Sequence, residues 1–137
     1  MVRPHRTAET LAAIVLCGAA VAACGGSSKP SYCSAVSNLE SSIKALPSTN
    51  VVATGLNGLK SAVAKVQSDA QTAINAAKSD FPTETTAVKN SIDGLSTTVK
   101  QAASSPTPAT IAQIPGEVSA VVSAVNSFQS ATKSKCS

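Results

Sequence analysis

Apolar side chains recur every three or four residues along most of the chain from residue 32 onward. This spacing places them on one face of a helix, whereas a half-buried strand would alternate with a period of two. Four such stripes run from Tyr32 to Leu46, from Val52 to Ala77, from Val88 to Ala102 and from Ile111 to Phe128. The pattern therefore predicts four amphipathic helices.

Proline and small polar residues separate these stripes. Pro47 ends the first helix, and the third helix is expected over about 82–104, before a segment rich in Ser, Thr and Pro over 104–110. This segment is expected to be a plain connector, with O-linked glycosylation as an alternative. We also expect an interruption at Pro115-Gly116, because proline removes a helix hydrogen bond and clashes with the preceding turn.

Four such helices with short connections predict an all-α protein. The expected architecture is an antiparallel up-and-down four-helix bundle over residues 32–137, packed at shallow crossing angles. In an alternative arrangement, the second and third helices form one long helix kinked at Pro82, because the apolar stripe keeps its phase through Phe81 to Val88. Phe81 precedes a proline and is biased away from helical geometry, which favours two separate helices.

The chain begins with a basic segment that is followed by an apolar run. Arg3 and Arg6 precede a stretch of about a dozen mostly apolar residues that ends at Val21, which is the pattern of a secretory signal peptide. This stretch is shorter than the roughly 20 residues that a transmembrane helix needs. We therefore expect residues 1–23 to be a signal peptide that is removed.

The sequence Val21-Ala22-Ala23-Cys24 resembles the lipobox of bacterial lipoproteins, in which the cysteine sulfur receives a diacylglyceryl group. The resemblance implies lipidation of Cys24 and anchoring at the extracytoplasmic face of the cell membrane. Residues 24–31 are expected to be the acylated cysteine and a flexible tether, because Gly25 to Ser31 read Gly-Gly-Ser-Ser-Lys-Pro-Ser. Val21 stands where the family more often has Leu. An ordinary signal peptidase would also accept Val-Ala-Ala, so plain secretion is the alternative.

The chain has four cysteines, of which two are expected to form a disulfide. If Cys17 leaves with the signal peptide and Cys24 is acylated, only Cys33 and Cys136 remain, and an oxidising compartment favours a bridge between them. An even number of up-and-down helices would bring both cysteines to the same end. A reactive cysteine pair would need a nearby His or a Cys-x-x-Cys spacing, and the mature chain has neither.

The whole mature segment is rich in Ala, Ser, Thr and Val with spaced lysines, and Cys33 and Cys136 bracket it. With the lipobox, this pattern resembles small uncharacterised lipoproteins of mycobacterial or actinobacterial type. The resemblance implies a place in the cell envelope and no particular activity.

The mature chain offers little reactive chemistry. It has no histidine, arginine or tryptophan, so we expect no catalytic, cofactor-binding or metal-binding residues, no enzymatic activity and no nucleic-acid partner. Asp80 and Glu84 are the one closely spaced acidic pair. They are expected to face the dipole at the start of the third helix rather than a metal ion.

Two functions fit these observations. The first is a membrane-anchored, non-enzymatic interaction or structural module of the cell envelope, whose partner is an envelope protein or polymer. The second is a carrier that holds a lipid or another apolar ligand within the bundle. The small Ala and Val side chains of the stripes suggest this alternative, because they could leave interior space.

Overall fold

The computed structural model describes residues 29–46 and 51–137, with the backbone alone for 51–54. The predicted signal peptide and Cys24 lie outside the described residues. Four helices make up the structure, namely α1 (Ser31–Ala45), α2 (Val51–Ala77), α3 (Pro82–Ser104) and α4 (Pro108–Cys136). Because no strand occurs over 29–46 or 51–137, the prediction of an all-α protein is confirmed.

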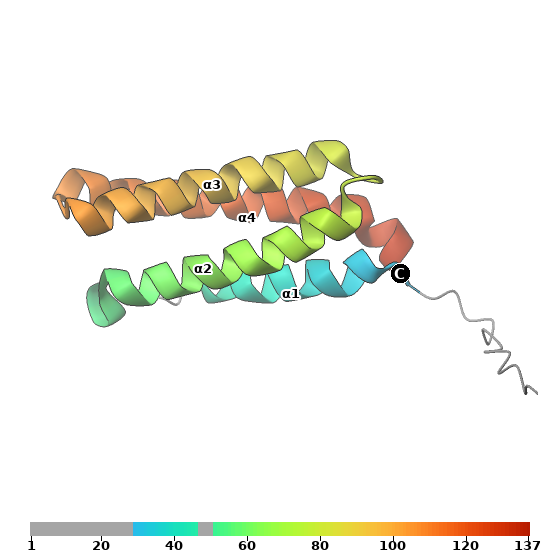
Figure 1. The fold of residues 1–137 in the computed structure, drawn as a ribbon, viewed down its shortest axis with the longest axis horizontal. Helices are drawn as coiled ribbons and strands as arrows, with labels where there is room; N and C mark the ends of the chain where they lie inside the picture. Colours follow the sequence, from blue (N-terminus) through green and yellow to red (C-terminus); the bar gives the residue numbers. More distant parts are fainter. Residues whose placement is uncertain (1–28, 47–50) are drawn as a thin grey trace, which may run out of the picture.

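The helices form an antiparallel up-and-down bundle (Figure 1). Each helix packs on the next one along the chain and α4 packs on α1, whereas the Cα atoms of the diagonal pairs stay more than 8 Å apart within the described ranges. One end of the bundle holds the start of α1, the α2–α3 turn and the end of α4, and we call it the disulfide end. The far end holds the end of α1, the start of α2 and the α3–α4 connection.

The second and third helices are separate, so the alternative of one long kinked helix is wrong. A turn over Lys78–Asp80 follows α2, and Phe81 has φ −134° and ψ 60°, outside the helical region. Pro82 is the first residue of α3, where its missing N–H removes no hydrogen bond. The restriction that proline places on the preceding residue explains the break.

Helix α2 is bent near its start, which corrects the expectation of a regular helix from Val52 onward. Gly55 has φ 68° and ψ 178°, so the backbone leaves helical geometry there before the helix continues to Ala77. A glycine reaches this conformation without steric penalty because it has no Cβ. The sharp bend is visible at the far end of α2 in Figure 1.

Helix α4 begins three residues earlier than the stripe suggests. The Thr107 hydroxyl accepts a hydrogen bond from the Thr110 N–H at 3.2 Å, and the Thr110 hydroxyl accepts one from the Thr107 N–H at 3.1 Å. This reciprocal cap satisfies two backbone donors at the helix start, and Pro108 supplies a preset φ at the first helical position. The connector between α3 and α4 is therefore only Ser105–Thr107.

The predicted interruption at Pro115-Gly116 is wrong, because α4 runs as one helix from Pro108 to Cys136 with Pro115 inside it. Proline costs the helix the hydrogen bond to the carbonyl four residues earlier, which is that of Ile111. Both Pro115 and Ile111 are exposed. Water can therefore reach this part of the backbone, and the helix continues despite the lost bond.

The core is built from the apolar stripes. Leu39, Leu59, Leu95 and Phe128 are its largest fully buried apolar side chains, and valine is the commonest of the other buried apolar residues. Ala70, Ala73 and Ala77 are also buried along the second half of α2. Small side chains allow neighbouring helices to approach closely. The core is therefore stabilised by many weak van der Waals contacts between small side chains.

The three Phe and Tyr residues of the chain meet at the disulfide end. The rings of Tyr32 and Phe81 lie 5.5 Å apart at 84°, and those of Phe81 and Phe128 lie 6.3 Å apart at 68°. Such edge-to-face pairs contribute about 0.5–1.5 kcal/mol each beyond the area that they bury. The cluster joins α1, the α2–α3 turn and α4, and it strengthens the disulfide end.

Candidate functional site

A disulfide joins the first and last helices. The sulfur atoms of Cys33 and Cys136 lie 2.04 Å apart and their Cα atoms 5.6 Å apart, so the predicted pairing is confirmed. Both residues are half-buried and pack against the core. The two sulfurs are bonded to each other, so neither is a free thiolate nucleophile.

A groove of about 760 Å³ opens between α1 and α4 beside this disulfide. These two helices make the sparsest contact among the four neighbouring pairs, which leaves space between them. Most of its lining side chains are polar: Lys29, Ser34, Ser37, Asn38, Glu40, Gln129, Ser130, Thr132, Lys133 and Ser137. The groove therefore suits a ligand that forms hydrogen bonds or carries negative charge. The carrier alternative, in which an apolar ligand lies within the bundle, stays a prediction.

A polar link between α1 and α4 joins two residues that line this groove. The Gln129 amide donates a hydrogen bond to Glu40 Oε2 at 2.6 Å, and Lys44 Nζ lies 2.5 Å from Glu40 Oε1. Both oxygens of the Glu40 carboxylate are thus engaged. Glu40 is paired with a positive charge at the surface of its own helix and with an amide donor from α4.

A second polar link connects α1 to α2, away from the groove. The Ser42 hydroxyl donates a hydrogen bond to the Asp69 carboxylate, and Lys65 Nζ lies 2.8 Å from the same carboxylate. The hydrogen bond from Lys65, followed by the one from Ser42, holds the pKa of Asp69 below its usual value. Because Asp69 is favoured in its charged form and its partners are in place, we assign this cluster a structural role.

Tyr32 also has a structural explanation. Its side chain is buried at the start of α1 against Phe81. Burial, followed by the negative charge of Asp80, raises the pKa of the Tyr32 phenol. The phenol therefore stays neutral at physiological pH and does not supply a phenolate.

The lysines divide into paired and unpaired groups. Lys44, Lys65 and Lys89 each form an ion pair with an acidic residue four positions away on the same helix. Among the described residues, no carboxylate lies within 4.0 Å of the remaining six ammonium groups. These unpaired lysines are Lys29, Lys60, Lys78, Lys100, Lys133 and Lys135.

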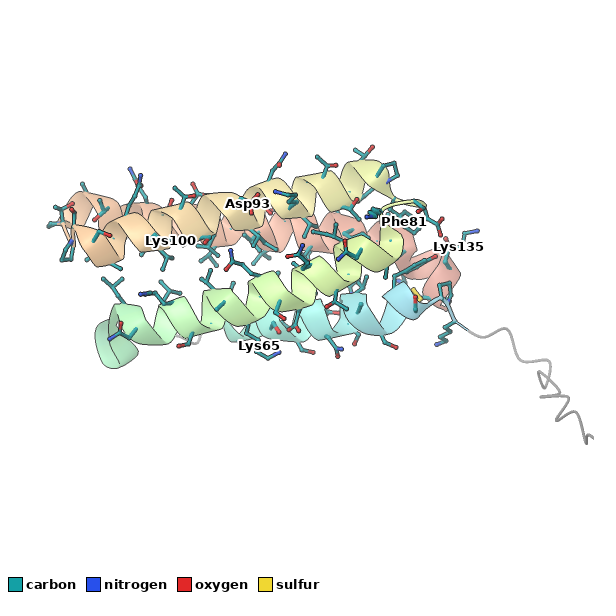
Figure 2. All side chains as sticks on the ribbon, in the orientation of Figure 1. Lys65, Phe81, Asp93, Lys100 and Lys135 are labelled. Carbon is teal, nitrogen blue, oxygen red and sulfur yellow. A yellow bond between two sulfur atoms is a disulfide. The ribbon has the colours of Figure 1, made fainter. Side chains whose placement is uncertain are left out.

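The unpaired lysines are concentrated at the disulfide end. Lys29 precedes α1, and Lys133 and Lys135 lie in the last turn of α4, while Lys78 lies in the α2–α3 turn. Lys60 and Lys100 lie toward the far end. Figure 2 shows Lys135 at the disulfide end and Lys100 in the opposite half of the bundle. The edge shared by α1 and α4 is therefore basic and carries the groove.

Glu84, one of the two acidic residues singled out from the sequence, has a structural position. Glu84 lies in the first turn of α3, where its charge favourably faces the helix dipole, although no side chain caps that helix start by a hydrogen bond. No group of three or more potential metal ligands occurs in the part of the chain that the structure describes. Over the same residues, none of the helices combines the length and apolar character needed to span a membrane.

Sequence reasoning did not identify the groove or the two polar links. Ser42 and Asp69 carried a weak signal, because each adjoins a buried stripe residue, Ile43 or Ala70, and a polar side chain there often crosses to a neighbouring helix. Glu40 and Gln129 carried the same weak signal, because they adjoin the buried Leu39 and Phe128, but nothing in the sequence paired them with each other. Their contact joins residues 89 positions apart and depends on how α1 and α4 are rotated in the bundle.

No protein-family model, curated protein or solved structure significantly matches this chain. Its function must therefore be inferred from its own residues.

Proposed function

We propose that this protein is a lipid-anchored, non-enzymatic module of the cell envelope, held at the extracytoplasmic face of the membrane through acylated Cys24. The observation that carries this proposal is the apolar run ending in Val21-Ala22-Ala23-Cys24, directly before a folded body. Helix α1 begins at Ser31, only seven residues after Cys24. The signal, the lipidated cysteine, the tether and the domain follow one another without a gap, as in the small lipoproteins that the sequence resembles.

One property of the domain supports this placement, and the energy of acyl insertion is sufficient for the anchor. The disulfide between Cys33 and Cys136 fits an oxidising compartment outside the cytoplasm. Acyl chains contribute roughly 0.8 kcal/mol for each methylene group that enters the bilayer, so two or three chains hold a protein firmly. A bundle anchored in this way needs no membrane-spanning segment of its own.

A binding role is favoured over catalysis by the chemistry of the groove. It offers hydroxyl, amide and ammonium groups, which can recognise a ligand by hydrogen bonds and charge. A catalytic hydroxyl would also need a positioned base. The only histidine of the chain is His5, within the expected signal peptide. We therefore assign the domain to interaction or structural support, with an envelope protein or polymer as its partner.

The anchor is tested by the intact mass of the protein extracted from membranes, measured with and without reduction. We expect cleavage before Cys24, an added mass of two or three acyl chains, and free thiols only after reduction. Cys24→Ser should abolish the acyl mass and release the protein from the membrane. Cys17→Ser is the matched control, because this cysteine leaves with the signal peptide, and its mature product should be unchanged.

An unacylated mature form of the wild-type protein would contradict the anchor. The interaction role is tested separately by cross-linking and co-purification from envelope extracts, with the lipidated protein compared with the released Cys24→Ser form. We expect a defined partner to be enriched with the lipidated form. If no protein or polymer is enriched, the proposal of an interaction module fails even if the anchor is correct.

A further inference from the structure

We propose that the disulfide end of the bundle docks on the anionic phospholipid headgroups of the membrane, through Lys29, Lys133 and Lys135. We call these three residues the lysine rim. This inference rests on the proposed lipid anchor at Cys24. It adds an orientation to that anchor, because it states which surface of the domain faces the bilayer and which lipid chemistry that surface binds.

The first argument is the charge of this edge. The three ammonium groups of the lysine rim are exposed, and none of them has a carboxylate within 4.0 Å among the described residues. They come from the two ends of the domain, which the disulfide brings together. Free ammonium groups held on one edge attract a negatively charged surface over about a Debye length, roughly 8–10 Å.

Two acidic residues, Asp80 and Glu84, also belong to the disulfide end, and the charge of Asp80 reaches Tyr32 at the start of α1. Asp80 is in the α2–α3 turn, close in sequence to Lys78, and Glu84 is in the first turn of α3. Neither belongs to α1 or α4. Glu40, which lines the groove, is engaged by Lys44 and Gln129. Among the described residues, no carboxylate therefore forms an ion pair with the lysine rim.

The second argument is the length and attachment point of the tether. Seven Gly/Ser-rich steps from Cys24 to Ser31 have a root-mean-square reach of roughly 15 Å when flexible. The tether joins the domain at the start of α1, which is part of the disulfide end. An acylated Cys24 would thus hold the lysine rim within about two Debye lengths of the headgroups, while the far end of the bundle stays distant.

The third argument is the continuity of the lysine rim with the groove. Lys29 and Lys133 both line the groove, next to the exposed hydroxyls of Ser34 and Ser130. Ammonium and hydroxyl groups are donors, and the oxygens of a phosphodiester are acceptors. The groove therefore provides hydrogen-bond donors for a headgroup phosphate in addition to the long-range attraction.

The lysines themselves supply the probes for a test. The lipidated mature protein is reconstituted in vesicles of phosphatidylcholine alone or with phosphatidylglycerol, and each lysine is footprinted with an amine-reactive reagent and mass spectrometry. In the anionic vesicles we expect labelling of each rim lysine to slow by roughly fivefold. Lys60 and Lys100 are exposed and unpaired but lie toward the far end, so their labelling should not change.

A matched pair of double variants tests whether the three lysines of the rim bind the membrane together. Lys133→Gln/Lys135→Gln should reduce the protection of Lys29 in anionic vesicles, whereas Lys60→Gln/Lys100→Gln should leave it intact. Molar salt should abolish the protection in the wild-type protein, because the Debye length then falls to about 3 Å.

The outcomes separate this inference from the anchor. A protein that floats with neither type of vesicle overturns the anchor, and the inference that depends on it falls too. A protein that floats with both vesicles but labels equally in each keeps the anchor and overturns the docking surface. Protection of the rim in native membranes but not in phosphatidylglycerol vesicles would assign this edge to another envelope component, and it would equally overturn the inference.

Discussion

At the scale of single residues, Asp69 is the ionisable group with the clearest link to stability. Lys65 and Ser42 hold its pKa below the ordinary value of 3.8. The unfolded chain therefore takes up this proton before the folded protein does as the pH falls. The contribution of Asp69 to folding is present above the ordinary value and is lost as the pH falls toward its folded pKa.

Asp69→Asn should therefore lower the free energy of unfolding at neutral pH. A hydrogen bond to a charged group contributes about 1.5–3 kcal/mol when buried, and the partial exposure of this cluster reduces the expected loss to about 1 kcal/mol. The difference from the wild-type protein should shrink as the pH falls below 3.8. Urea denaturation of both proteins across this pH range measures it.

Asp93→Asn is the matched control. Asp93 also pairs with a lysine four positions away, but its side chain keeps 56% of its accessible surface. Exposed pairs of this kind contribute about 0–1 kcal/mol, so the effect of this variant should be small at every pH. If the two variants behave alike, the Ser42–Asp69 link does not stabilise the bundle.

At the scale of the helices, substitution of Gly55 in α2 and of Gly116 in α4 by alanine should change the stability of the protein in opposite directions. Gly55→Ala should destabilise the protein by about 1–3 kcal/mol, because its backbone conformation (φ 68°, ψ 178°) is essentially restricted to glycine. Gly116→Ala should stabilise it by about 0.5–1 kcal/mol, because this position is helical and nothing lies within 4 Å of an added Cβ.

Thermal denaturation followed by circular dichroism distinguishes the two effects. Gly55→Ala should lower the melting temperature and Gly116→Ala should raise it. An unchanged or higher melting temperature for Gly55→Ala would mean that the start of α2 straightens into a continuous helix at no cost, contrary to the bend seen in the structure.

The existence of the four helices could be predicted because most residues of each apolar stripe are buried in the core, although Ile111 at the start of the fourth stripe is exposed. Features that depend on one backbone position could not be predicted in the same way. Gly55 interrupts a stripe that otherwise keeps its phase, and Pro115 looks like a helix breaker although its solvent-exposed position makes it tolerable. The start of α4 was missed because the cap that Thr107 shares with Thr110 lies ahead of the first apolar stripe residue.

At the scale of the whole molecule, the disulfide should dominate the response to substitution. Cys33 and Cys136 are 103 positions apart, and the chain-entropy model assigns about 4.7 kcal/mol to a loop of that size. Measured values are often smaller, so we expect Cys33→Ser/Cys136→Ser to lower the free energy of unfolding by about 2–4 kcal/mol. Chemical denaturation at neutral pH measures this loss.

Reduction provides the matching control for this experiment. The reduced wild-type protein should unfold at the same denaturant concentration as the double variant, and the variant should not respond to reductant. A double variant as stable as the oxidised protein would mean that the aromatic cluster and the core alone hold the disulfide end together.

The pairing itself could be predicted from the whole chain, because the even number of helices and the expected loss of Cys17 and Cys24 left two partners at one end. The groove could not, since it arises from the looser packing of α1 on α4 and from their relative rotation. The hydrogen bond between Gln129 and Glu40 can be recognised only when the positions of α1 and α4 are known.

The position of the disulfide also determines how the domain bears mechanical load. Cys33 lies in the first turn of α1, so a pull on the proposed tether enters the bundle two residues before a covalent link to α4. The force is then shared by two helices that run in opposite directions, and α1 cannot be peeled away from its neighbours one turn at a time. A protein held to a membrane by its first residues is in this way protected where tension would act first.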